Sequence, residues 1–396
     1  MSALLERVRV LELTDGLPGA MCGKMMAAAG ADVILVEPPE TGVGVRWEPP
    51  FLDDIRGPDR SGVFLYTAGG KRSLTLDPST PDGREIFARL LTHADILIED
   101  RAEKTPVVSA ENAPPGFNPR LVRITLRKFS PGGPYENYAA ETELEPAALG
   151  GWMIQLGDVG RTPLLGNSRT MTAFVPGVMG AITGIAAYLS ARQTGAGVNL
   201  DLSEHEALLF NTRYNETYFS YTGMEIKRHG KSFAGWSPTY RVFDAADGFV
   251  SCAASTDAQV ELFLQLAGVD LEPFATREAR YDRAEELVAR LNDWTKSKTR
   301  EEIFHQGQQW RVPMGAASTL DEVMGLAQLK HRTYFDEIDH PVAGRRAYPG
   351  LPLRFDDSRP RSGRAPLLGE HTAAILCDEL GYSRDDVAAL MNLRVV

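Results

Sequence analysis

The sequence contains few of the residues that mark disulfide frameworks or metal sites. Its 396 residues include only three cysteines, Cys22, Cys252 and Cys377, which lie far apart and form no C-x-x-C pair. We therefore expect neither a disulfide framework nor a zinc site, and we expect a reducing, cytoplasmic location. The seven histidines show no spacing typical of metal ligands, so no metal cofactor is expected.

Positive charge and long apolar runs are also scarce. Lys and Arg number 42 against 53 Asp and Glu, which gives a formal net charge of -11. Phosphate-backbone binding depends on clustered Lys and Arg, so general nucleic-acid binding is not expected. The most apolar stretch, residues 173–191, is interrupted by Pro176 and three glycines, which favours a buried helix over a membrane span. The first ten residues lack the apolar core of a signal peptide, and no membrane partner is expected.

The N-terminal segment predicts a strand, a turn, a helix and a second strand. Residues 8–13 and 32–36 are apolar and strand-like, and residues 21–29 are rich in helix formers. Thr14 and Asp15 offer side-chain oxygens that could cap the start of the helix. The pattern is typical of a mononucleotide-binding βαβ unit.

The glycines of the turn do not fit a dinucleotide site. Such a site needs G-x-G-x-x-G, whereas Gly16, Gly19 and Gly23 are spaced G-x-x-G-x-x-x-G. Glu37 closes the second strand where a ribose-binding acid would stand, but it does not restore the site by itself. A dinucleotide oxidoreductase is therefore the least favoured function.

The rest of the chain predicts a parallel α/β domain followed by a smaller α+β domain. Two long helices, around residues 174–190 and 203–221, precede a hairpin at 240–252. The predicted domains are residues 1–222, a smaller domain at 223–330, and a return linker with the C-terminal part of the large domain at 331–396. The other predicted elements are strands at 73–76, 95–98 and 121–125 and helices at 83–92 and 370–380.

Several blocks follow one another in an order that resembles the class III CoA-transferases, the superfamily of formyl-CoA transferase, carnitine CoA-transferase and α-methylacyl-CoA racemase. The N-terminal βαβ segment is the first block, and the resemblance spans nearly the whole chain. The later blocks are KRSLTLD at 71–77, ADILIE at 94–99, NPRLV at 118–122, GPY at 133–135, TGAG at 194–197 and PLLGEHT at 366–372.

The resemblance implies a fold and an activity. The fold would be α/β, with a Rossmann-like large domain built from N- and C-terminal segments, a smaller α+β middle domain, and two chains interlocked as a homodimer. The activity would be transfer of CoA between an acyl-CoA thioester and a carboxylic acid. CoA would be a co-substrate, and no cofactor would be bound permanently.

The resemblance places Glu143 where the family has a nucleophilic aspartate. A carboxylate is ionised at neutral pH and can attack a thioester to form a mixed anhydride, here an acyl-glutamyl intermediate. Two other interpretations stay open. Glu143 could be the N-cap of a helix in which Pro146 stands at N3, where no N–H is needed, or a shifted alignment could hide the nucleophile at Glu141 or Glu145.

CoA carries phosphates, so this acidic chain must concentrate positive charge locally. The cationic candidates are Arg46, Lys71, Arg72, Arg127 and Lys128. The resemblance adds the first turn of the N-terminal helix and a basic–aromatic pair after residue 126. The candidate CoA contacts are Leu17, Pro18, Gly19, Arg46, Lys71, Arg72, Asp100, Arg101, Arg127 and Phe129.

Two further functions remain as alternatives. One is proton chemistry next to a thioester, as in the α-methylacyl-CoA racemases, which need two acid/base groups. Those enzymes carry G-H-D-x-N-Y, whereas residues 139–144 here read AAETEL without a histidine. The other is a non-catalytic acyl-CoA-binding subunit, which would bind CoA without turnover.

Overall fold

The computed structural model describes most of the chain as two compact units. It covers residues 4–100, 118–138, 140, 148–149, 157, 160–161, 168–225, 230–232, 238–354 and 359–396, without the side chains of 168–169 and 211–215. The large unit is Met1–Gly150, Asn167–Phe210 and Lys330–Val396, and the smaller unit is Gly151–Gly166 and Asn211–Leu329. The large unit therefore draws on both ends of the chain.

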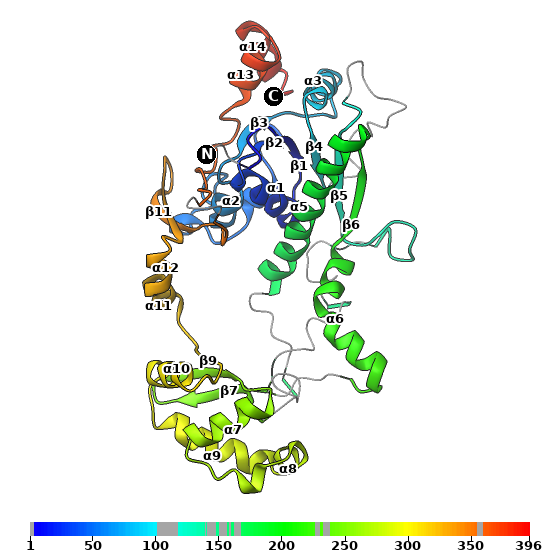
Figure 1. Ribbon diagram of the computed structural model, residues 1–396. Coiled ribbons are helices and arrows are strands. Elements are labelled where there is room, and N and C mark those ends of the chain that lie inside the picture. Colours follow the sequence, from blue (N-terminus) through cyan, green and yellow to red (C-terminus); the bar gives the residue numbers. More distant parts are fainter. Residues whose placement is uncertain are drawn as a thin grey trace. The chain divides into compact units, whose positions relative to one another are not determined.

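A six-stranded parallel sheet forms the centre of the large unit (Figure 1). Its strand order β3-β2-β1-β4-β5-β6 is that of a doubly wound fold, and the order reverses between β1 and β4. This confirms the predicted α/β class. The strands are β1 (Arg9–Leu13), β2 (Asp32–Glu37), β3 (Arg72–Thr75), β4 (Ile96–Glu99), β5 (Val122–Arg127) and β6 (Asn199–Ser203), of which β6 was not predicted.

Helices cover both faces of this sheet because its strands alternate apolar side chains between the two faces. On one face Val10 and Ile124 pack with α1 (Leu17–Ala28) and α5 (Ser168–Thr194). On the other, Leu11 packs with α3 (Pro81–Thr92) and with Ile375 and Leu376 of the C-terminal segment. Other helices of the large unit are α2 (Gly62–Thr67), α13 (Thr372–Ala374), a π-helical turn (Ile375–Glu379) and α14 (Arg384–Asn392).

Helix α5 contains one stretch, Thr170–Thr194, that is long and apolar enough to cross a membrane, but half of its apolar 18-residue window is buried inside the protein. Two of its glycines lie directly against other elements. A Cβ added at Gly177 would lie 2.5 Å from the backbone oxygen of Pro18 in α1, and one at Gly184 would lie 2.3 Å from Ile124 Cδ1 in β5. The apolar run is therefore a helix packed closely on α1 and the sheet, as the sequence predicts.

This close crossing predicts that Gly177→Ala destabilises the protein by about 1–3 kcal/mol, because the added methyl overlaps the backbone of α1. The overlap outweighs the gain of about 1 kcal/mol in helix propensity. Gly180→Ala, in the same helix, is the control, since its Cβ would lie 3.3 Å from the Sγ atom of Cys22, a side-chain neighbour that can shift. Urea unfolding measures both variants, and equal losses would contradict the close crossing.

The smaller unit is built on a three-stranded antiparallel sheet of order β7-β8-β9. Pairing of β7 (Tyr240–Ala245) with β8 (Gly248–Ala253) confirms the predicted hairpin, and β9 (Met314–Ala316) joins β8. Phe243, Phe263 and Phe274 lie in its core. Its helices are α7 (Asp257–Leu266), α8 (Arg277–Asp282), α9 (Ala284–Lys296), α10 (Arg300–Gln309) and α11 (Leu320–Gly325), and α6 (Glu204–Thr222) leads into it from the large unit.

A second hairpin follows α12 (Ala327–His331), where no strands were predicted. Strands β10 (Phe335–His340) and β11 (Gly344–Pro349) pair antiparallel. Most of their side chains are exposed and several are charged. The hairpin therefore shows too little apolar alternation to be recognised in the sequence.

Candidate functional site

The candidate site is the edge of the large unit's sheet where the strands end. In a sheet of this order, small molecules bind outside the carboxyl ends of the strands, at the point where the order reverses. Here that point lies between β1 and β4, and α1 begins beside it. Leu17, Pro18 and Gly19 form the first turn of α1 and are buried.

The carboxylate of Asp100 binds the backbone amides that directly precede α1. Its carboxylate accepts hydrogen bonds from the backbone N–H of Asp15 at 2.8 and 3.0 Å and from that of Gly16 at 2.7 Å. In a dinucleotide-binding fold these amides would face the pyrophosphate. A carboxylate of the chain itself already satisfies them, which argues against a dinucleotide cofactor.

The predicted capping by Thr14 and Asp15 is wrong. The N-cap is Gly16, which has no side-chain capping bond. Thr14 Oγ1 instead donates to Glu12, and the Asp15 carboxylate accepts from the backbone N–H of Gly44 at 2.5 Å. Asp100, the residue after the neighbouring strand β4, instead binds the amide of the N-cap residue Gly16.

Arg46 lies in a buried ion pair with Glu37. Its guanidinium nitrogens lie 2.6 and 2.7 Å from the two oxygens of Glu37, and both side chains are 0% exposed. A third nitrogen binds Asp59 at 2.7 Å, and the guanidinium lies 3.8 Å from the ring centre of Phe64. Arg46 therefore holds the segment after β2 against the sheet, and we assign it a structural role rather than a CoA contact.

Lys71 and Arg72 also form ion pairs within the large unit. Lys71 Nζ lies 2.7 Å from Glu12 Oε2 in the buried interior, where burial raises the pKa of Glu12 and the Lys71 charge opposes that shift. Arg72 starts β3 and binds Asp32, the first residue of β2, at 2.7 Å. Arg72 therefore reaches toward the amino ends of the strands, away from the candidate edge, and Lys71 is enclosed.

The carboxyl end of β5 carries cations that solvent can reach. Arg127 Nε lies 3.0 Å from Asp201 Oδ2, with side chains 36% and 38% exposed. Lys128 binds Glu204 at 2.8 Å and is partly exposed. Phe129 is buried against the ring of Tyr135, at a centroid distance of 5.6 Å. The structure thus places Leu17, Pro18, Gly19, Asp100, Arg127 and Phe129 at the carboxyl ends of the strands, whereas Arg101 and Glu143 lie outside the described residues.

Comparison with known proteins assigns the chain to a family. The family model described as CoA-transferase family III matches residues 5–372. The chain belongs to this family. Members of this family transfer CoA between an acyl-CoA and an acid. The family match therefore supports this activity for the chain.

Individual relatives agree with this assignment. The chain is 28% identical to a succinate–glutarate CoA-transferase of Agrobacterium fabrum, with 94% of this chain and 95% of the relative covered. It is 30% identical to a succinyl-CoA:mesaconate CoA-transferase of Haloarcula hispanica, with 95% and 96% covered. A solved CAIB/BAIF family protein from Brucella suis superposes with a TM-score of 0.80 at 26% identity, with 96% and 100% covered.

Proposed function

We propose that this family III CoA-transferase works through a covalent acyl anhydride on Glu143. The Glu143 carboxylate attacks the thioester carbonyl, the C–S bond breaks, and CoA leaves as a thiolate. The thiolate then attacks the glutamyl carbonyl, which releases the first acid and leaves a glutamyl-CoA thioester. The acceptor carboxylate repeats the sequence in reverse, and CoA leaves on the acceptor acid.

The path of the chain supports this role for Glu143. Residues 130–138 continue from the carboxyl end of β5, where Arg127 and Phe129 lie, and Glu143 follows five residues later. A carboxylate is ionised at neutral pH and needs no general base to attack. The chain that leads to Glu143 therefore leaves the sheet at the carboxyl ends of the strands, where ligands bind in folds of this strand order.

Two of the cysteines are poorly suited to replace the carboxylate as nucleophile. Cys22 and Cys252 are buried, and burial raises the pKa of both thiols, that of Cys252 to about 12. A thiol attacks as its thiolate, so a raised pKa suppresses its reactivity at neutral pH. This observation favours carboxylate chemistry over a cysteine acyl-enzyme at either position.

We propose that CoA binds along the carboxyl edge of the sheet. Arg127 would pair with a phosphate of CoA, and Phe129 would support the backbone of Arg127. The turn of Leu17, Pro18 and Gly19 would contact the ligand together with Asp100 and Arg101. The ion pair between Arg127 and Asp201 is partly exposed, and exposed ion pairs are weak. Arg127 can therefore release Asp201 and bind a phosphate instead. Charge-assisted hydrogen bonds to phosphate are stronger.

The proposed role of Arg127 predicts that Arg127→Ala raises the KM for acyl-CoA about tenfold, as expected for the loss of a charged hydrogen bond. The kcat at saturating acyl-CoA should change little. Asp201→Asn is the matched control, because it frees Arg127 without removing its charge and should not raise the KM. An unchanged KM in Arg127→Ala would remove this residue from the CoA site.

We infer that the acceptor is a dicarboxylic acid. Succinate, glutarate and mesaconate are named as substrates of the Agrobacterium fabrum and Haloarcula hispanica relatives, and all three are dicarboxylic acids. Initial rates with succinyl-CoA and a panel of mono- and dicarboxylic acids test both substrate class and mechanism. Parallel double-reciprocal lines support the covalent intermediate. Intersecting lines would contradict release of the first acid before the acceptor binds, and α-proton exchange without CoA transfer would favour the racemase alternative.

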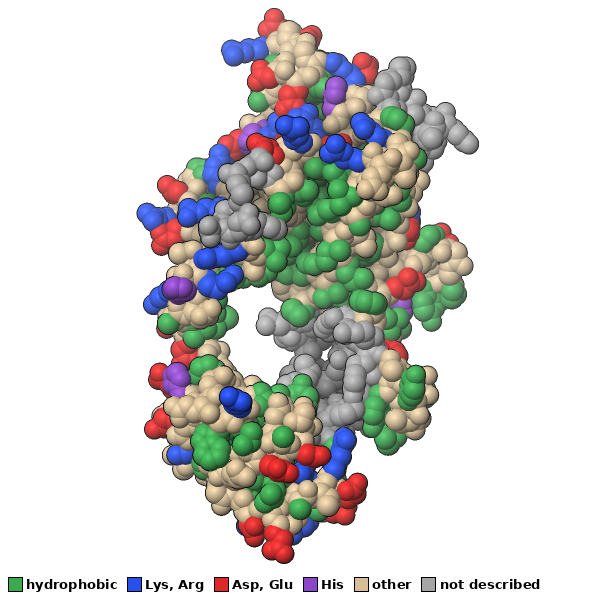
Figure 2. All heavy atoms as spheres, in the orientation of Figure 1, with side chains coloured by type: hydrophobic (Ala, Val, Ile, Leu, Met, Phe, Trp, Pro, Cys, Tyr) green, Lys and Arg blue, Asp and Glu red, His purple; other side chains and the backbone are tan. Residues whose placement is uncertain are grey.

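We infer that the enzyme is a cytoplasmic homodimer. Met171, Ile182 and Leu189 of α5 are 52%, 63% and 56% exposed. Figure 2 shows hydrophobic side chains gathered over α5 on this face of the large unit. Large exposed apolar patches are uncommon on monomers, so a second copy is the expected cover, with the chains interlocked as in the family. Light scattering after size exclusion tests the dimer.

A further inference from the structure

A polar cavity lies at the amino ends of the large unit's parallel strands, whereas the proposed CoA site lies at their carboxyl ends. It has a volume of about 230 Å³ and is lined by Arg7, Asp95, Arg120, Tyr188, Ala191 and Arg192. Arg7, Asp95 and Arg120 stand just before β1, β4 and β5, so the cavity opens at the amino ends of the strands. This volume is below the roughly 300–1,000 Å³ of drug-sized ligand sites, so it suits a compact ligand better than CoA.

Three arginines meet at this cavity without carboxylate partners among the described residues. Arg7, Arg120 and Arg192 are exposed and take part in none of the ion pairs formed by the described part of the chain. Such a cluster is unexpected in a chain with a net charge of -11. Together with the single carboxylate of Asp95, the lining carries a net positive charge and therefore favours an anion.

The backbone that carries these arginines is fixed in place. Asn118 donates to the backbone oxygen of Ala94 at 2.8 Å and accepts from the backbone N–H of Arg120 at 3.0 Å, which ties the Arg120 turn to the start of β4. Asp95 accepts from the backbone N–H of Arg9 at 2.9 Å. Because these turns are ordered before any ligand arrives, binding costs less conformational entropy.

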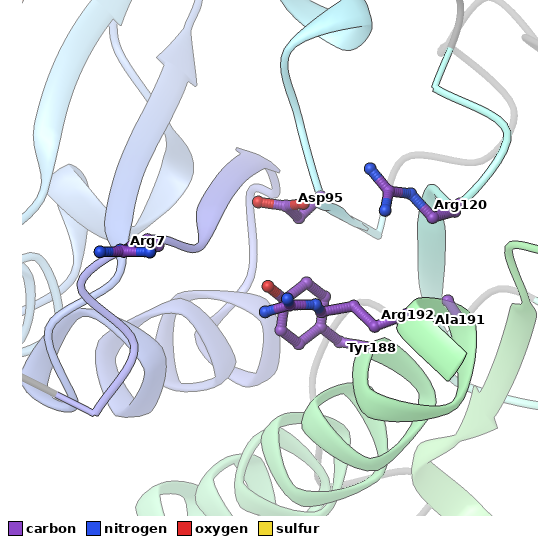
Figure 3. Close-up of a pocket in the computed structure, with 6 residues that line it drawn as sticks. All are labelled: Arg7, Asp95, Arg120, Tyr188, Ala191 and Arg192. Carbon is purple, nitrogen blue, oxygen red and sulfur yellow. The ribbon is translucent and has the colours of Figure 1, made fainter. Parts of the chain in front are cut away.

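The side chains of Arg192 and Tyr188 lie together in this cavity. Arg192 lies 5.9 Å from the ring centre of Tyr188. In Figure 3 it extends from α5 over Tyr188 toward the space between Arg7 and Asp95. A cation in the last turn of a helix is stabilised by the helix dipole, which explains Arg192 alone. It does not explain Arg7 and Arg120, which come from two other segments of the chain.

We propose that this cavity is an auxiliary binding site for a compact dianion, either a phosphate or a short dicarboxylate. Guanidinium groups bind both through paired, charge-assisted hydrogen bonds, and the hydroxyl of Tyr188 can donate another. The site is separate from CoA transfer, because it lies at the amino ends of the strands. A bound dianion would bridge β1, β5 and α5 through Arg7, Arg120 and Arg192.

Isothermal titration with inorganic phosphate and, separately, with succinate tests the proposal. Excess CoA is present throughout, so that phosphate binding at the proposed CoA site does not contribute heat. The arginine variants separate succinate bound in the cavity from succinate bound as acceptor at the transfer site. The wild-type chain should bind at least one of the two anions saturably, and the stronger binder identifies whether phosphate or dicarboxylate is the preferred class. Arg120→Gln and Arg192→Gln should each weaken that binding about tenfold.

Two further variants make the test specific. Asp95→Asn keeps an oxygen that can accept from the Arg9 amide but removes a negative charge, so it should tighten anion binding. Arg384→Gln, at the exposed start of α14 outside the cavity, should leave binding unchanged. The proposal is overturned if neither anion binds saturably, or if binding is the same in Arg120→Gln, Arg192→Gln and wild type.

Discussion

Replacement of Glu143 by glutamine is expected to lower kcat/KM for CoA transfer by at least about a thousandfold, since removal of an enzyme's nucleophile can cost still more than this. The amide has nearly the same size as the carboxylate but cannot attack a thioester or form an anhydride. Binding of CoA should stay close to that of the wild type, because the proposed contacts lie on other segments. Steady-state kinetics with succinyl-CoA, together with titration of CoA, measures both quantities.

Neighbouring glutamates provide the matched controls. Glu141→Gln and Glu145→Gln remove the same charge two residues away on either side and should keep transfer within about tenfold of wild type. Glu143→Asp shortens the nucleophile by one methylene and should lose on the order of a hundredfold, because a displacement of about 1 Å has that effect. If Glu141→Gln or Glu145→Gln is inactive while Glu143→Gln is active, the nucleophile is misassigned.

Replacement of Arg46 by methionine is expected to destabilise the large unit by about 3–5 kcal/mol, the largest stability effect among the variants considered. The change leaves the Glu37 carboxylate buried without its cation, since both side chains are 0% exposed. The hydrogen bond from Ser73 Oγ to Glu37 Oε1, at 2.6 Å, remains but does not neutralise the charge. Urea unfolding followed by circular dichroism measures the loss.

An exposed ion pair and a double variant are the controls for Arg46. Arg345 and Glu337 pair on the surface with side chains 73% and 59% exposed, so Arg345→Met should cost no more than about 1 kcal/mol. Adding Glu37→Leu to Arg46→Met should recover stability, because no unpaired charge is then buried. If Arg46→Met instead weakens CoA binding at unchanged stability, Arg46 belongs to the CoA site after all.

The sequence predicts those parts of the fold in which apolar periodicity is strong. Strands β1 to β5 are buried, and their predicted bounds agree with the structure within a few residues, as do those of the hairpin of β7 and β8. Strand β6 is five residues long with alternating exposed positions, and β10 and β11 are mostly exposed and charged. Their pairing depends on tertiary contacts rather than on a pattern within the segment, so the sequence alone does not reveal them.

The sites are less predictable because their partners are distant in sequence. The sequence predicts the turn after β1 but not the hydrogen bond from the Asp15 amide to Asp100, which lies 85 positions further along the chain. The sequence predicts Arg46 as a phosphate-binding cation, and only its contact with Glu37 in the structure shows that its side chain is enclosed. The arginine cavity joins residues 7, 120 and 192, which no spacing rule connects.

The most direct test of the proposed mechanism is to trap the acyl group on Glu143. The purified enzyme is incubated with succinyl-CoA and hydroxylamine, digested, and analysed by peptide mass spectrometry. The account predicts a hydroxamate on Glu143, because hydroxylamine captures the activated glutamyl carbonyl, and no such product in Glu143→Gln. An unmodified Glu143 in a sample that binds CoA and transfers it to an acceptor acid would contradict the covalent mechanism.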